Sequence, residues 1–147
     1  MKVLIQRVTR AAVTIKGHAE VAIGRGFAVL LGVAISDTPD DARKLANRTA
    51  DLRIFPDDQE KMNRSLIDID GEALVVSQFT LQADTRKGNR PSFINAAPPE
   101  QAKPLYELYV ASLRERLGAN RVKTGVFRAS MVVEILNDGP VTIELSS

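Results

Sequence analysis

The stretch Phe27-Ala28-Val29-Leu30-Leu31-Gly32-Val33-Ala34-Ile35 is apolar throughout, with Gly32 as its only interruption. A short apolar run of this kind is typical of a strand that is buried on both faces. The run is well short of the ~20 residues that a membrane-spanning helix requires. It therefore predicts a central strand of a sheet, covered on both sides by other elements.

Further segments rich in β-branched and apolar residues surround this run and are also predicted to be strands. Turn-forming pairs separate several of them, and the clearest pairs are Gly17-His18 and Asp70-Gly71. The predicted strands are Lys2–Val8, Ala11–Ile15, Ala19–Ile23, Ile54–Phe55, Met62–Ile67, Ala73–Leu81, Arg121–Lys123, Ala129–Leu136 and Val141–Leu145.

Two stretches carry the signals of helices. Thr38 is a good N-cap, Pro39 suits the first helical position, and small or apolar residues then recur at helical spacing as far as Leu52. A second helix is predicted over roughly Gln101–Leu117. Because Pro104 has no amide to donate, we expect this helix to start late or to be kinked.

The elements comprise many strands and two helices in no strict alternation. This pattern predicts the α+β class, with helices packed on a sheet. The 147 residues and 44% hydrophobic content fit one domain, residues 1–147, and exclude a disordered or fibrous chain.

The absence of cysteine and the single histidine, His18, limit the chemistry of this chain. They exclude disulfides, iron–sulfur clusters, thiolate zinc sites, a cysteine nucleophile and any site with several histidines. The sequence predicts neither a metal nor a cofactor. The N-terminal residues lack the apolar core of a signal peptide, so we expect a soluble, cytoplasmic protein with no membrane partner. An enzyme of this composition must use backbone groups, hydroxyls or its own substrate.

Polar residues follow the apolar part of the predicted strand Ala73–Leu81, beginning at Ser77-Gln78 and continuing to Thr80. The simple interpretation is a strand end that becomes exposed to water. The alternative is a ligand-lined edge, where free amides can stabilise an oxyanion.

Two further segments have both a structural and a functional interpretation. Asn137-Asp138-Gly139-Pro140 is dense in turn-forming residues, and the sequence alone favours a trans bond at Gly139-Pro140. The same pair presents carbonyl groups with little side-chain bulk, which suits a pocket wall. The basic segment Arg86-Lys87-Gly88-Asn89-Arg90 lies in a long polar connection, Gln82–Pro99. It is either a solvated loop or a contact for phosphate groups.

These segments together resemble the D-aminoacyl-tRNA deacylases, freestanding enzymes that hydrolyse D-amino acids from mischarged tRNA. The resemblance runs along essentially the whole chain, and the order of a Ser-Gln-Phe-Thr-Leu and an Asn-x-Gly-Pro-Val-Thr motif is specific to that family. The matching segments are Ile5–Ala11, Val29–Val33, Arg53–Phe55 with Lys61–Asn63, Ser77–Leu81, Arg90–Phe93 and Asn137–Thr142. This chain departs from the family's pattern at Arg128 and Ser130, and Pro104 is unusual.

The resemblance implies a compact β/β/α fold, barrel-like in its sheets, that works as a homodimer with two active sites at the subunit interface. Gly139-Pro140, with its bond cis, would enter each site from the partner subunit and would be fixed by Arg7. The residues implied to line the pocket or lie near it are Ser77, Gln78, Phe79 and Thr80, the catalytic set, with Met131 and Phe93 beside them. Arg86, Lys87 and Arg90 are candidates for tRNA binding.

The implied reaction is ester hydrolysis of D-aminoacyl-tRNA, and glycyl-tRNA mischarged on the alanine tRNA is an expected second substrate. The ribose hydroxyl beside the ester would assist, and the amides near Phe79 and Thr80 would bind the oxyanion. The rival mechanism makes Thr80 a covalent nucleophile, for which no neighbouring base is visible. Three competing functions stay open: a nucleic-acid-binding module without activity, an editing domain for L-seryl esters, and a structural dimer.

Overall fold

The structure is a computed structural model that describes residues 1–147. A six-stranded sheet contains β2 (Val21–Ile23), β1 (Lys2–Thr14), β3 (Gly26–Gly32), β6 (Glu72–Ser77) and β7 (Val122–Thr124) in that order, with β8 (Val132–Ser146) paired to β1. The β3–β6 and β6–β7 pairs are parallel and the others are antiparallel. This mixed sheet with two helices confirms the predicted α+β class.

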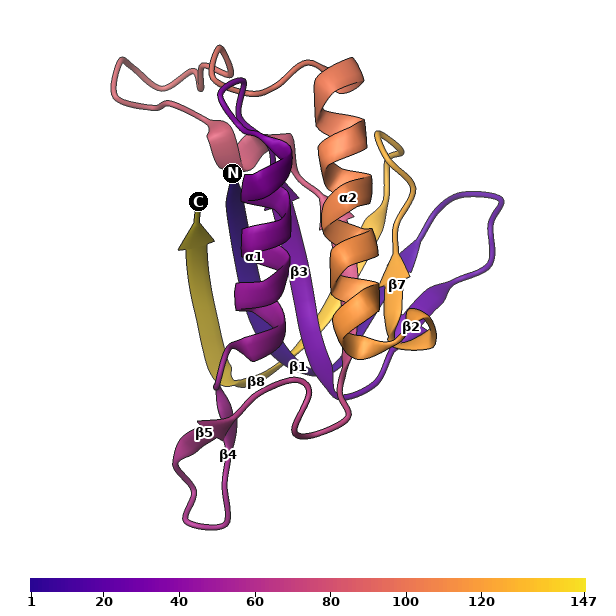
Figure 1. The fold of residues 1–147 in the computed structure, drawn as a ribbon. Coiled ribbons are helices and arrows are strands. Elements are labelled where there is room, and N and C mark those ends of the chain that lie inside the picture. Colours follow the sequence, from indigo (N-terminus) through magenta and orange to yellow (C-terminus); the bar gives the residue numbers. More distant parts are fainter.

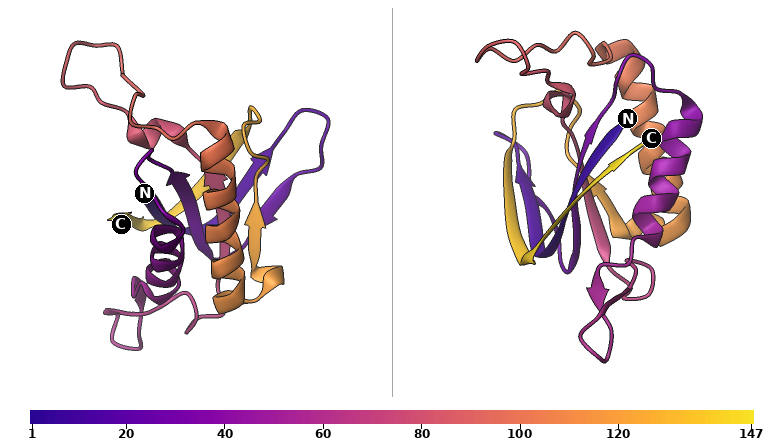
Figure 2. Two further views of the ribbon diagram at one scale, coloured as in Figure 1. Left: turned by 45° about the horizontal axis from the view of Figure 1, so that its top comes forward. Right: turned by 90° about the vertical axis from the view of Figure 1, so that its left-hand side faces the viewer.

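The long strand β1 divides the sheet into two layers. Its first half, Lys2–Val8, pairs with β3, and its second half, at Ala11–Val13, pairs with β2, while β8 follows it along both halves. The second half of β1, together with β2 and the part of β8 beside it, folds over one face of β3 and β6. The helices α1 (Pro39–Asp51) and α2 (Pro99–Leu117) cover the other face. The side view in Figure 2 shows the resulting β/β/α layers.

Two hydrophobic cores follow from the period-two alternation of β3 and β6. Phe27, Val29 and Leu31 face the helices and belong to the larger core. Ala28 and Leu74 face the outer strands and belong to the smaller core. Both faces of these strands are buried, as the apolar run Phe27–Ile35 predicts, although the strand itself ends at Gly32.

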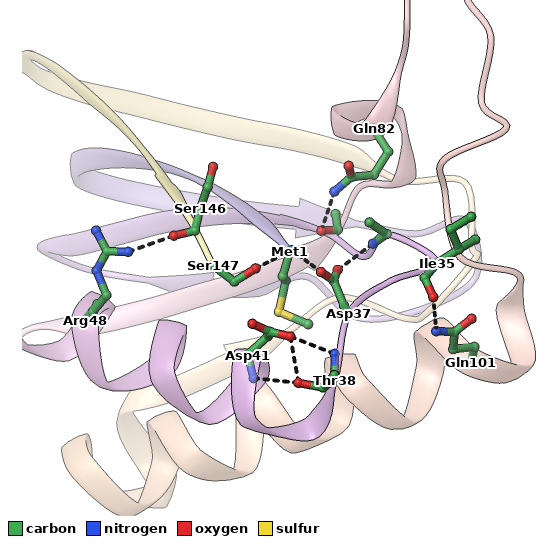
Figure 3. A network of polar contacts seen from close by, with 12 residues as sticks. Met1, Ile35, Asp37, Thr38, Asp41, Arg48, Gln82, Gln101, Ser146 and Ser147 are labelled. Carbon is green, nitrogen blue, oxygen red and sulfur yellow. Dashed lines mark hydrogen bonds and ion pairs between the residues drawn. The ribbon is translucent and has the colours of Figure 1, made fainter.

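Helix α1 begins as the sequence predicts. The side chains and amides of Thr38 and Asp41 form a reciprocal capping box, with the Thr38 amide donating to Asp41 Oδ2 at 2.8 Å (Figure 3). Ala42, Leu45 and Thr49 are buried, in agreement with the predicted stripe.

Helix α2 begins at Pro99, so the predicted late start is wrong. Pro99 occupies the first turn, where its missing amide would have no partner inside the helix. Pro104 lies inside the helix and leaves the carbonyl of Glu100 without its usual donor. Glu100 is exposed, so water can serve that carbonyl.

The boundaries of several predicted strands differ from the structure. The segments Lys2–Val8 and Ala11–Ile15 form the single strand β1, because β8 pairs with both of them despite shifts of register between Gln6 and Arg10. Met62–Ile67 is a strand only over β5 (Met62–Arg64), which pairs with β4 (Phe55–Pro56) in a separate two-stranded sheet. The third difference, at the end of β6, shapes the candidate site.

No helix of the chain is both long enough and apolar enough to cross a membrane.

Candidate active site

A cavity of about 490 Å³ lies where β6 ends. Most of its wall is apolar, and the only ionisable side chain among the lining residues is that of Arg128. The lining residues are Val33, Val76, Ser77, Gln78, Phe79, Ala97, Pro99, Ala102, Phe127, Arg128, Ala129, Met131 and Val133. Three of the four predicted catalytic residues and Met131 therefore line one cavity.

The chain turns sharply at the floor of this cavity. Ser77 is the last strand residue and pairs with Leu31, and the amide of Gln78 still donates to the carbonyl of Leu31 at 2.8 Å. The chain then forms the short 3-10 helix η1 (Phe79–Gln82). The predicted continuation of the strand to Leu81, with Gln78 and Thr80 on one face, is therefore wrong.

The turn leaves two backbone donors free. Leu81 donates its amide to the carbonyl of Gln78 at 3.2 Å, but the amides of Phe79 and Thr80, at the start of η1, have no acceptor within this turn. The first amides of a helical turn lack intrahelical partners, so they are available to an external oxygen. This pair lies beside the cavity that Gln78 and Phe79 line.

Thr80 lies beside the cavity rather than in its wall. Its Oγ1 accepts a hydrogen bond from the side-chain amide of Gln78. An amide N–H cannot remove a proton from a hydroxyl, so this contact does not activate Thr80 as a nucleophile.

Phe79 and Phe93 form an exposed aromatic pair. Their ring centroids are 5.0 Å apart at an interplanar angle of 64°, an edge-to-face contact. Phe79 is 56% exposed although it is a large apolar side chain. Phe93 therefore lies next to Phe79, although it does not line the cavity itself.

The segment Asn137–Val141 is a bulge within a strand, and the prediction of a turn between two strands is wrong. Gln6 pairs with Thr142 and Val8 pairs with Asn137, so the residues between them on β8 bulge out opposite Arg7. The Gly139-Pro140 bond in this bulge is cis, whereas the sequence alone favours trans. The φ angle of Gly139 is 127°, in a region that L side chains rarely adopt.

Arg7 holds this bulge through backbone contacts. Its Nε donates to the carbonyl oxygen of Asp138 at 3.0 Å and lies 3.1 Å from the Asp138 carboxylate. Its Nη1 donates to the carbonyl oxygen of Ile54 at 2.6 Å. The guanidinium thus ties the residue before Gly139 to the segment that follows α1.

Within one chain, Gly139-Pro140 and the cavity lie at opposite ends of the sheet. Arg7 pairs with Phe27 at one end of β3, whereas Ser77 pairs with Leu31 at the other end. Figure 1 shows the bend of β8 at the bottom of the sheet and η1 at the top. None of Arg7, Gly139 and Pro140 lines the cavity of its own chain.

The basic loop projects beyond the fold, as Figure 1 shows at its upper left. Asp84 and Ser92 pair across its base through two backbone hydrogen bonds. The guanidinium of Arg86 holds the pKa of Asp84 at about 2, and no acidic partner contacts Lys87 or Arg90. Two of the three candidate cations are therefore unpaired.

The sequence does not point to several residues of the cavity wall. Val33 lies in the apolar run but beyond the end of the strand, and Ala97, Pro99 and Ala102 carry no chemical signal. Arg128 marks a departure from the family's pattern, and the structure puts its side chain at the cavity with a φ angle of 64°.

The model of one protein family, described as D-Tyr-tRNA(Tyr) deacylase, matches residues 4–146. The chain belongs to the D-Tyr-tRNA(Tyr) deacylase family. It is 57% identical over 147 residues to the D-aminoacyl-tRNA deacylase of Roseiflexus castenholzii, covering 100% of this chain and 92% of that protein. It is 53% identical over 147 residues to that of Thermus aquaticus, with 100% and 95% covered.

Two solved structures share the fold of this chain. The c-Myc DNA Unwinding Element Binding Protein superposes with a TM-score of 0.94 at 46% identity, covering 100% of this chain and 99% of that one. A probable eukaryotic D-amino acid tRNA deacylase shares the fold, with a TM-score of 0.85 at 18% identity and 99% and 98% covered. Deacylases of this family are hydrolases that act on the aminoacyl-tRNA ester bond.

Proposed function

We propose that this protein hydrolyses D-aminoacyl-tRNA with its backbone and its substrate as the catalytic groups, and that it rejects L-aminoacyl esters by shape. The observation that supports this most is the pair of unpaired amides, Phe79 and Thr80, beside a cavity whose wall holds no carboxylate, lysine or histidine. Such a site can stabilise an oxyanion but contains no general base of its own.

The reaction follows from this arrangement. Water attacks the ester carbonyl carbon, the developing oxyanion accepts hydrogen bonds from the amides of Phe79 and Thr80, and the bond to the ribose oxygen then breaks. The ribose oxygen takes up a proton, so the products are the free D-amino acid and tRNA. One oxyanion donor typically lowers the activation free energy by about 2.7–4 kcal/mol.

The vicinal ribose hydroxyl of the terminal adenosine replaces the missing protein base. The substrate itself holds this hydroxyl beside the carbonyl, where it can orient the attacking water. Groups positioned in this way can lower a barrier by roughly 7–11 kcal/mol. A protein nucleophile is therefore not needed, and the hydrogen bond from Gln78 to the hydroxyl of Thr80 does not favour one.

The selection of D-amino acids requires a second copy of the chain. Gly139 and Pro140 lie far from the cavity of their own subunit, so they can reach a site only in a homodimer. Their carbonyls, close to the substrate's α-carbon, would leave no room for an L side chain, whereas a D side chain would point outward. Glycine has no side chain to exclude, so glycyl-tRNA, including glycine mischarged on the alanine tRNA, is also a substrate.

Incubation of the purified protein with D-tyrosyl-, L-tyrosyl- and glycyl-tRNA tests this function. We expect the D-tyrosyl and glycyl esters to be hydrolysed and the L-tyrosyl ester to survive at the rate of a sample without protein. Hydrolysis of the L-tyrosyl ester would refute selection by shape, and complete resistance of the glycyl ester would refute the Gly139-Pro140 wall.

Binding to nucleic acid without hydrolysis is the second candidate function. The unpaired cations Lys87 and Arg90 suit any phosphate backbone, and one similar solved structure is that of the c-Myc DNA Unwinding Element Binding Protein. Tight binding of tRNA or DNA with no loss of D-tyrosyl ester would favour this function.

We predict that the protein acts in the cytoplasm, where charged tRNA is used.

A further inference from the structure

We infer that Gln82 is a positioning residue for the reaction, because its side chain fixes the turn that presents the amides of Phe79 and Thr80. Gln82 is the last residue of η1 and its side chain is buried. Its Nε2 donates to the carbonyl oxygen of Gly32, at the end of β3, at 2.9 Å. The close-up in Figure 3 shows this bond between η1 and the central strand.

The two ends of η1 are anchored to the same strand in different ways. Before the turn, the backbone amide of Gln78 donates to Leu31. After it, the side chain of Gln82 bonds to the carbonyl of Gly32 at the end of β3. The chain then enters the projecting loop, whose Phe93 contacts Phe79 at the other end of η1. The hydrogen bond from the Gln82 side chain therefore holds the C-terminal end of η1 on β3.

The packing between η1 and β3 leaves little freedom for a shift toward the strand. A Cβ atom at Gly32 would lie 2.9 Å from the carbonyl oxygen of Gln78 and 2.9 Å from Cβ of Leu81. Real Cβ atoms do not approach backbone that closely, so only glycine permits this contact. The close contact with Gly32 prevents η1 from moving toward β3, and the hydrogen bond from Gln82 prevents it from moving away.

The inference rests on the proposed catalytic role of the two amides. Donors to an oxyanion act only at a defined distance, and a misplacement of about 1 Å can cost on the order of 100-fold in rate. Gln82 contacts neither the cavity nor the substrate, so its effect passes through the position of Phe79 and Thr80.

The test compares Gln82→Met with Gln101→Met in the assembled protein. Methionine keeps the length of the side chain but cannot donate. Gln101 is a matched control, because its Nε2 also donates at 2.9 Å to a backbone carbonyl, that of Ile35 (Figure 3). We expect Gln82→Met to lower kcat for D-tyrosyl-tRNA roughly 10- to 100-fold with KM within about twofold, and Gln101→Met to leave both unchanged.

Amide hydrogen exchange provides a second readout that a general loss of stability would not reproduce. In Gln82→Met, the amides of Leu81 and Ala83, which bond within the turn, should exchange about tenfold faster than in the unsubstituted protein. The amide of Gly125, which bonds to Val75 on β6, should keep its rate. If Gln82→Met does not fold, Gln82→Asn, which falls one methylene short of Gly32, is used in the same assays.

The inference is overturned if folded Gln82→Met keeps its kcat, if KM rises alone, if Gln101→Met loses as much, or if exchange accelerates everywhere equally. Failure of the proposed function has a different signature, because the unsubstituted protein would then not hydrolyse D-tyrosyl-tRNA at all.

Discussion

Arg7 and Asp138 join strands that are far apart in sequence, and their contact fixes the entry to the cis Gly139-Pro140 bond. Nε of Arg7 donates to the carbonyl oxygen of Asp138 at 3.0 Å, and Nη1 reaches Ile54 at 2.6 Å. A guanidinium provides two donors in a fixed plane, so one side chain serves both carbonyls. If the bulge forms the chiral wall of a partner's site, Arg7 determines the shape of that wall from a distance.

The first prediction concerns Arg7→Met. Loss of a hydrogen bond from a charged donor costs roughly 1.5–3 kcal/mol, so the bulge should loosen and L-tyrosyl-tRNA should be hydrolysed faster than by the unsubstituted protein. Arg48→Met is the matched control, because Arg48 also donates to a β8 carbonyl, that of Ser146, at 2.7 Å. Equal rates for the two variants would show that the bulge needs no support from Arg7.

The second prediction separates backbone catalysis from a covalent mechanism. Thr80→Ala removes the hydroxyl but keeps the amide, so the deacylation rate should stay within about tenfold of the unsubstituted protein. Removal of a true nucleophile costs on the order of 10⁴-fold or more. A loss of that size in single-turnover assays, with an unchanged melting temperature, would establish Thr80 as the nucleophile.

The third prediction ranks the three cations of the projecting loop by the salt dependence of tRNA binding. Each phosphate contact contributes roughly 0.7–0.9 to the slope of log affinity against log salt. Arg90→Ala and Lys87→Ala should each flatten the slope by about this amount. Arg86→Ala should flatten it less, because the Arg86 guanidinium is already bonded to Asp84. Identical slopes in all variants would remove the loop from the binding surface.

The fourth prediction uses the two tyrosines, both of which lie in α2. Burial raises the pKa of Tyr106 to about 12 and also raises that of Tyr109. Since the unfolded value is about 10, the fold favours the neutral phenols, and this stability is complete below about pH 10. It is lost as the pH rises from about 10 to 12.

Titration of phenolate absorbance checks this packing. At about pH 11 the native protein should show little phenolate, whereas the unfolded chain should show both tyrosines ionised. Tyr106→Phe should make the melting temperature less sensitive to pH in this range, although Tyr109 still contributes. Ionisation of both groups near pH 10 in native protein would mean that α2 does not bury them.

Local patterns in the sequence were enough to predict the central strand, helix α1 and the polar residues at the end of β6. The apolar run of β3 and the capping signal at Thr38 depend on neighbouring residues only, so they are visible without a structure. The cis bond, the partner's contribution and the roles of the site residues came only from the resemblance to a family.

The features that were missed depend on contacts between distant parts of the chain. The continuity of β8 through Gly139-Pro140 requires β1 beside it, and the turn at Phe79 requires close packing on Gly32. Ala97 enters the cavity wall beside Val33, to whose carbonyl its amide donates at 2.9 Å, and Ala102 enters it from α2. No local pattern carries this information.

The most direct test of a shared chiral wall is a crystal structure of the protein with a non-hydrolysable D-tyrosyl-adenosine analogue. We predict that the carbonyl oxygen of the analogue contacts the amides of Phe79 and Thr80 in one subunit, with Gly139 and Pro140 of a second copy against its α-carbon. A complex in which Gly139 and Pro140 of every copy lie away from the bound analogue would contradict it.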